Sequence, residues 1–181
     1  MATSTRSATS ARSTTSTRTT AKIRTAADGR GFDSLEQQAF LNLWRTYDRL
    51  RMVEDKLFAR HDLTGQQYNV LRLLRGEHPG VLPTLTLAGR LVSRAPDITR
   101  MLDKLEERGL VRRERSAENR RTVFVGITPA GLKLLGELDA PVRECHTRQL
   151  GHLKRTELRQ LIALLSTARR PHEDGGHWGG N

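Results

Sequence analysis

The sequence of 181 residues is poor in several features, and each scarcity excludes a class of protein. Phe, Trp and Tyr make up only 4% of the chain, which argues against an RNA-binding platform that stacks bases on exposed aromatic rings. The single cysteine, Cys145, excludes an internal disulfide and fits a reducing compartment. No apolar run approaches the roughly 20 residues that a membrane-spanning helix needs, so no membrane partner is expected.

Acidic residues are scarce relative to basic ones. The chain has 31 Lys and Arg residues against 20 Asp and Glu residues, a formal net charge of +11. This excess favours a polyanionic partner: nucleic acid is the first candidate, and a membrane surface is the second but is disfavoured because the chain has no membrane-spanning run. Hydrophobic residues amount to a low 36%, but the deficit lies mainly at the two ends. The remaining middle, about 140 residues, is long enough to bury one core.

The first 30 residues consist mainly of Ser, Thr, Ala and Arg, and they oppose six basic residues to the single acidic Asp28. Such a segment cannot bury enough apolar surface to offset its ordering entropy, so residues 1–30 are predicted to form a disordered basic tail. Whether it is a plain tail, an arm that touches DNA or an organelle transit peptide stays open. Residues 171–181, rich in Gly and His, are predicted to be a flexible C-terminal tail.

Between the tails, residues 31–170 are predicted to form one domain with helices at both of its ends. The pattern predicts a first helix over 34–60 and two more helices within 128–170, in which Pro141 ends or kinks the first of the two near residue 140. The last helix carries four apolar residues expected in the core: Leu158, Leu161, Ile162 and Leu165. These segments hold more apolar surface than one small domain buries, which favours dimerisation helices.

The segment 62–127 is predicted to contain a helix-turn-helix followed by a β-hairpin. A helix over 84–91 precedes a helix over 94–108 with Ser93 as its N-cap, and the strands are expected at 110–114 and 122–127. The fold class is therefore mainly α with a small β-hairpin wing: a winged helix-turn-helix with N- and C-terminal dimerisation helices. Such a unit commonly reads duplex DNA, so 62–127 is the predicted DNA-binding lobe.

The helix expected over 94–108 is amphipathic. Ile98, Leu102 and Leu105 fall on one side at 100° per residue, and the opposite side is polar and basic. In the major groove, an arginine on that side would bond a guanine through two hydrogen bonds. The alternative is an ordinary solvated helix face. The candidate DNA contacts here are Arg94, Asp97, Thr99, Arg100 and Lys104.

The hairpin holds five arginines against two glutamates within residues 112–121. Guanidinium groups at the end of a two-stranded hairpin suit the negative potential of a narrow minor groove. The alternative is a solvated charged loop. The candidate contacts in this wing are Arg115, Arg120 and Arg121.

The run ITRMLDKLEERGLVRR, followed by ENRRTVFVGITPAG, resembles the MarR family of bacterial transcriptional regulators, and with LTGQQYNVLRLL upstream the resemblance covers about residues 35–165. It implies a homodimer whose first, fifth and sixth helices intertwine, a pseudo-palindromic operator, and relief of repression by a small aromatic or anionic effector or an oxidant. It also implies that Thr99, Arg100 and Lys104 face the major groove and Arg121 the minor groove.

The chain departs from the family pattern at two positions. Asn119 stands before the wing arginine pair, where the family usually carries Asp. Arg94 stands where some members have an acidic residue that pairs with a wing arginine, which leaves Asp97 as a substitute partner.

Other chemistry is weakly indicated. Cys145 lies near Arg143, His146 and Arg148, which could lower the pKa of its thiol, so a redox sensor is the alternative to an inert helix cysteine. A metal site in the C-terminal tail is a second alternative, with the candidate ligands His172, Glu173, Asp174 and His177. No catalytic triad or phosphate-binding loop stands out, so no enzyme activity, cofactor or metal is predicted.

These observations predict a sequence-specific, DNA-binding transcriptional regulator of the bacterial cytoplasm, a ligand-responsive repressor that binds a pseudo-palindromic operator as a homodimer. Two alternatives remain. A non-specific architectural DNA-binding protein would use the same positive charge without preference for sequence. A winged-helix protein-interaction module would bind little DNA even at low salt.

Overall fold

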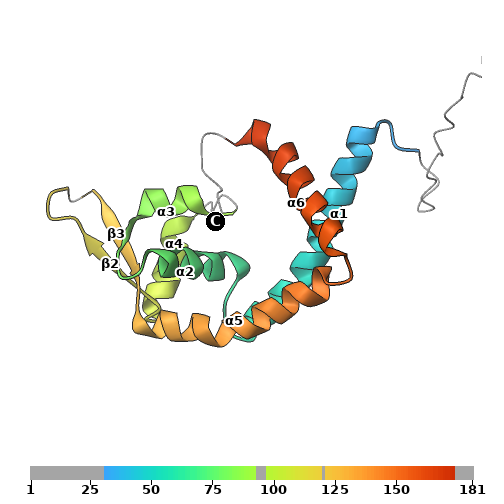
Figure 1. Ribbon diagram of the computed structural model, residues 1–181. Coiled ribbons are helices and arrows are strands. Elements are labelled where there is room, and N and C mark those ends of the chain that lie inside the picture. The colour runs from blue at the N-terminus through green and yellow to red at the C-terminus, as the bar shows by residue number, and fades with distance from the viewer. Residues whose placement is uncertain (1–30, 93–96, 120, 174–181) are drawn as a thin grey trace, which may run out of the picture. The chain divides into compact units, whose positions relative to one another are not determined.

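The structure is a computed structural model that describes residues 31–92, 97–119 and 121–173 (Figure 1). The chain divides into two units, Met1–Ala39 and Phe40–Asn181, and the description below concerns the second. The elements follow in the order α1 (Leu35–Ala59), α2 (Gly65–Glu77), β1 (Leu82–Pro83), α3 (Thr84–Arg90), α4 (Ile98–Glu107), β2 (Val111–Arg115), β3 (Val123–Ile127), α5 (Pro129–Leu150), α6 (Arg155–Arg169) and the short 3-10 helix η1 (Arg170–His172). This order confirms the predicted helices and hairpin.

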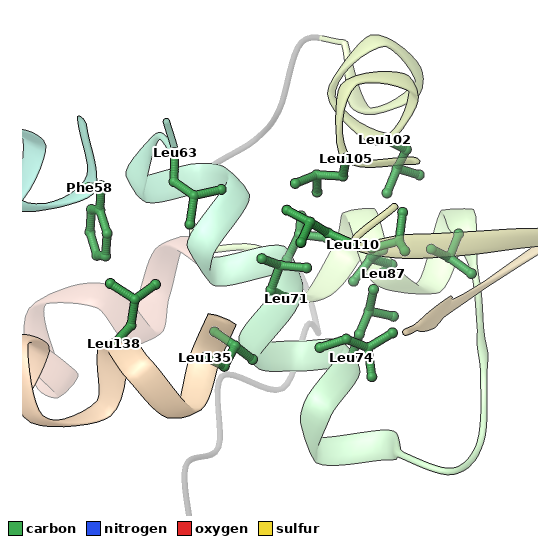
Figure 2. Close-up of a cluster of buried hydrophobic side chains, with 14 of the residues drawn as sticks. Phe58, Leu63, Leu71, Leu74, Leu87, Leu102, Leu105, Leu110, Leu135 and Leu138 are labelled. Atoms are coloured by element: carbon green, nitrogen blue, oxygen red, sulfur yellow. The ribbon is translucent and has the colours of Figure 1, made fainter. Parts of the chain in front are cut away.

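The core of the second unit is built from leucines of α2, α3, α4 and α5. Leu71 on α2 is fully buried, and Figure 2 shows it between Leu135 of α5 and Leu87 of α3, with Leu105 of α4 nearby. The helix that holds Leu71 begins with a reciprocal cap, in which the Thr64 hydroxyl and the Gln67 side chain each accept a backbone N–H of the other residue. Local capping and the apolar stripe thus act together to place α2 at the centre of the lobe.

The sheet is antiparallel in the order β1–β3–β2. Its hairpin register pairs Val111 with Ile127 at the base and Arg115 with Val123 at the far end. β1 adds the pair of Leu82 with Val125, which is fully buried. The hairpin therefore has an apolar base packed on the core and a basic end that extends beyond the helices (Figure 1).

α5 is one helix, so of the two alternatives for Pro141, an end or a kink near residue 140, the end is wrong. Proline removes a backbone N–H and crowds the preceding turn, which usually interrupts a helix. Here Leu138 before the proline and Val142 and Cys145 after it are all buried, so packing on both sides holds the helix together. The Arg75 guanidinium also bonds the Asp139 carboxylate at 2.9 Å, joining α2 to α5.

One predicted helix start was wrong. α4 begins at Ile98 with Asp97 as its N-cap, and the expected cap, Ser93, lies outside the described residues. Several side chains near a helix start can cap it, and tertiary packing selects one of them.

The expected core of α6 was also wrong for a single chain. No residue of α6 is buried, and Ile162 is 63% exposed. The exposed part of α1 is similar, because Trp44 and Tyr47 are 62% and 57% exposed although both are large and apolar. Within one chain, the other elements leave much of the apolar side of these two helices uncovered.

Leu71→Ala is expected to lower the free energy of unfolding by about 2–5 kcal/mol, because it removes buried methyl groups and leaves a cavity in a packed core. Chemical denaturation followed by circular dichroism measures it. Leu85→Ala is the matched control, since Leu85 is 86% exposed on α3, and its effect should stay within about 0.5 kcal/mol. Equal effects of the two changes would contradict the assignment of the core.

Candidate nucleic-acid interface

α4 presents a polar and basic face to solvent because its apolar face packs against the core. Leu102 and Leu105 are 1% and 0% exposed, whereas Thr99, Arg100 and Lys104 are exposed. The predicted separation of the two faces is confirmed, with Ile98 half-buried on the core side. The exposed residues lie on successive turns of one helix, so they form a continuous stripe of donors.

Asp97 caps the start of α4. Its carboxylate accepts the backbone N–H of Arg100 at 2.9 Å. A capping carboxylate satisfies an unpaired amide and also interacts favourably with the positive end of the helix dipole. The structure therefore gives Asp97 a structural task, the capping of α4. Arg94 lies outside the described residues.

The far end of the hairpin is shaped by side-chain turns. The Ser116 hydroxyl accepts the backbone N–H of Asn119 at 3.2 Å, and the side-chain oxygen Oδ1 of Asn119 accepts that of Arg121 at 3.0 Å. Asn119 thus supplies the local hydrogen bond that an aspartate would also supply, without its negative charge. Arg115 and Arg121 are exposed beside this turn, and Arg120 lies outside the described residues.

An ion-pair cluster that the sequence did not indicate joins the hairpin to α4. The Nε of Arg113 on β2 donates to Glu106 of α4 at 2.8 Å, and Nη2 lies 2.6 Å from the Asp103 carboxylate. The backbone N–H of Arg113 donates to Glu106 as well, at 3.1 Å. Asp103 is exposed on α4, and its carboxylate forms an ion pair with Arg113 of the hairpin.

This cluster also affects the pKa of Arg113. Hydrogen bonds to the Glu106 carboxylate raise the pKa of the guanidinium further above its ordinary value, although an arginine is charged at physiological pH in any case. The side chain is only 25% exposed, which reduces screening of the pair by solvent. Arg113 therefore fixes the orientation of the hairpin on α4. A spacing of seven residues across a turn has no periodic signature, which explains why sequence analysis did not find it.

A second joint lies between the end of α4, the start of β2 and the start of α5. Gly109 has φ +67°, a left-handed conformation that favours glycine, and it ends α4. The Thr128 hydroxyl donates to the Gly109 carbonyl at 2.7 Å and accepts the Gly131 N–H at 3.1 Å, which caps α5. Gly131 approaches so closely that a Cβ there would lie 2.4 Å from the Leu110 carbonyl oxygen. α4 and the hairpin are thus fixed to α5.

The remaining candidates do not form a second site. Cys145 is 1% exposed, and burial is the main cause that raises the pKa of its thiol, which opposes a reactive thiolate. Among the residues that the structure describes, no His, Cys, Asp or Glu cluster could hold a metal, and of the four expected tail ligands Asp174 and His177 lie outside them. In the same part of the chain, no helix is long and apolar enough to cross a membrane.

Comparisons with known proteins agree with this geometry. A model of the MarR family matches residues 63–123. The chain is 55% identical to a MarR transcription factor from Planctomyces limnophilus, with a TM-score of 0.61 over 76% of this chain and 99% of that one.

Two further structures share the fold. A mutant MarR from E. coli complexed with operator DNA is 21% identical, with a TM-score of 0.64 over 74% of this chain and 94% of that one. BpsR of Bordetella bronchiseptica, whose DNA binding is regulated by 6-hydroxynicotinic acid, is 23% identical, with a TM-score of 0.66 over 72% and 98%. At these identities the likeness concerns the fold alone.

Arg113→Gln is expected to lower the free energy of unfolding by about 1–2 kcal/mol, because it leaves Glu106 and Asp103 without their cation in a partly screened site. Amide hydrogen exchange of β2 should also become faster. Arg112→Gln is the control, since Arg112 is 47% exposed and pairs with Glu114 of its own strand, and it should cost less than about 0.5 kcal/mol. If both variants exchanged β2 amides equally fast, the orienting role of Arg113 would be wrong.

Proposed function

Because the chain belongs to the MarR family of transcription regulators, we propose that it binds a pseudo-palindromic DNA operator as a homodimer and represses transcription until a small aromatic or anionic ligand releases it. The observation that carries this proposal is the orientation of α4 about its own axis. Burial of Leu102 and Leu105 turns Thr99, Arg100 and Lys104 to solvent along one stripe. A helix of that kind fits the major groove, which is about 12 Å wide.

The proposed contacts divide into base and backbone contacts. Arg100 lies in the first turn and a half of α4, where a recognition helix meets base edges, and its guanidinium can bond a guanine through two hydrogen bonds. Thr99 and Lys104 would bond phosphates or a neighbouring base edge. In the wing, Arg115 and Arg121 would lie along the minor groove. The E. coli relative is complexed with operator DNA, which supports the same use of this fold.

A homodimer is supported by the apolar surface that one chain leaves exposed. Phe40, Leu43, Trp44 and Tyr47 of α1 line an open hollow on the protein surface. α6 adds Ile162 and Leu164, which are 63% and 68% exposed. Monomeric proteins rarely expose several large apolar residues together, and a second copy would cover them. Two copies related by a two-fold axis would present two α4 helices to two half-sites about one helical turn apart.

The ligand response is supported by a relative and by the way the lobe is joined. DNA binding of BpsR is regulated by 6-hydroxynicotinic acid, an aromatic acid. In this chain, α4 and the wing are fixed to α5 through Thr128, so a ligand that favours one orientation of α5 would move them together. Release of the operator is then a shift between dimers with suitable and unsuitable spacing of α4.

Trp44→Glu is expected to weaken dimerisation by about 100-fold or more, because the interface would bury an unpaired carboxylate in place of an aromatic anchor. Sedimentation equilibrium at micromolar concentration measures it. Leu85→Glu is the control, since Leu85 is equally apolar and 86% exposed but lies on α3. A wild-type protein that sediments as a monomer would refute the dimer.

Arg100→Ala and Arg121→Ala are expected to differ in kind. The first should lose roughly 1–3 kcal/mol of discrimination between the operator and a duplex mutated at one guanine. The second should weaken binding to both duplexes equally and lower the slope of log K against log salt by about one.

The measurement is a fluorescence-anisotropy titration at several salt concentrations, on a duplex selected from a random library by the full-length protein. A wild type that binds selected and random duplexes equally would instead support the architectural alternative, and no binding at low salt would support the protein-interaction module.

A further inference from the structure

The end of α4 is attached to the end of α1 by one side chain. Arg108, the C-cap of α4, donates through Nη2 to the carbonyl oxygen of His61 at 3.0 Å and through Nη1 to that of Asp62. Arg108 lies 47 positions after His61 and 46 positions after Asp62 in the sequence. The α1–α4 link, as we call Arg108 with these two carbonyls, connects the proposed reading helix with the proposed dimerisation helix.

Both ends of the link are built for it. α1 ends in a turn where Asp62 has φ +51°, the Leu63 N–H donates to the Phe58 carbonyl, and the carbonyls of His61 and Asp62 lie beyond the last turn of α1. Helix C-termini carry a partial negative charge and carbonyls without helical partners, which a guanidinium satisfies. α4 ends in the same kind of turn, with the Leu110 N–H donating to the Leu105 carbonyl. The planar guanidinium of Arg108 thus joins the turn after α4 to the turn after α1.

We propose that Arg108 is a positioning residue that sets the distance between half-sites that the dimer accepts. The inference rests on the proposed function, because it requires that α1 lies in the dimer interface and that α4 reads DNA. The partner copy would fix α1 in the dimer. The angle between α4 and α1 then determines the distance between the α4 helices of the two copies. A change of one base pair in the spacer moves a half-site by about 3.4 Å and rotates it by about 35°.

A direct role in DNA binding is the competing explanation. Arg100, Lys104 and Arg108 follow one another at intervals of four, so they share one side of α4, and Arg108 is exposed. A phosphate contact would make Arg108 a general contributor to affinity. The hydrogen bonds to His61 and Asp62 instead direct its guanidinium to backbone carbonyls of the same chain.

The test uses full-length protein and a duplex selected by the wild type, together with the same half-sites separated by one base pair more and one base pair less. A fourth duplex carries a single half-site. The variants are Arg108→Gln, Arg108→Lys and the control Arg90→Gln, which removes the same charge from a residue paired with Glu77 inside the DNA-binding lobe. Thermal unfolding and sedimentation confirm that each variant folds and dimerises.

For Arg108→Gln, the preference for the selected spacer over the altered spacers is expected to fall by about threefold or more, which corresponds to the lower end of what one hydrogen bond contributes in water. Affinity for the single half-site and the salt slope should stay unchanged. Arg108→Lys should restore part of the preference, because it keeps the charge but not the planar fork. Arg90→Gln should leave the preference as it is.

Two results would overturn the proposal while the proposed function stands. A uniform loss of affinity for all four duplexes with a smaller salt slope would make Arg108 a phosphate contact. An unchanged preference would show that the α1–α4 link sets no spacing. If the wild type itself binds no selected duplex as a dimer, the proposed function fails, and this inference fails with it.

Discussion

The orientation of α4 about its own axis is the constraint on which the rest of the structure depends. Leu102 and Leu105 are buried in a core centred on α2, and a turn of one residue, 100°, would expose them and bury charge. This apolar contact, not any polar one, decides which side chains face outward. The basic stripe, the register of the wing against α4 and the attachment of α4 to α1 all presuppose that one orientation.

Much of the fold follows from local patterns in the sequence. The order of helices and strands was predicted, and the caps of α2 at Thr64 and of α5 at Thr128 are hydrogen bonds formed within a few residues. The start of α4 was not predicted, because Ser93 and Asp97 are both good caps and only the packed helix selects between them. The continuity of α5 through Pro141 likewise depends on burial that no local rule contains.

The candidate site was predicted in the same uneven way. The exposed stripe on α4 follows from helical periodicity, but the partners of Arg113 and Arg108 do not, since they depend on how distant segments meet. The net charge of the chain does not show which arginines are already bound to groups of the chain. Arg108 and Arg113 bind groups of the chain itself, whereas Arg100 and Arg121 are exposed where a polyanion could approach. The family assignment rests on similarity across most of the chain, and the individual contacts with DNA remain proposals.

The joint at Thr128 has a consequence for how such a regulator can diversify. One hydroxyl serves the end of α4 and the first turn of α5, and Gly131 leaves no room for a methyl group beside Leu110. Positions 109, 128 and 131 are therefore expected to vary together or not at all during evolution. The exposed residues of α4 and the hairpin end are free of that restriction. Under the proposed function, point mutations in these exposed residues would change the target sequence without rebuilding the support that carries them.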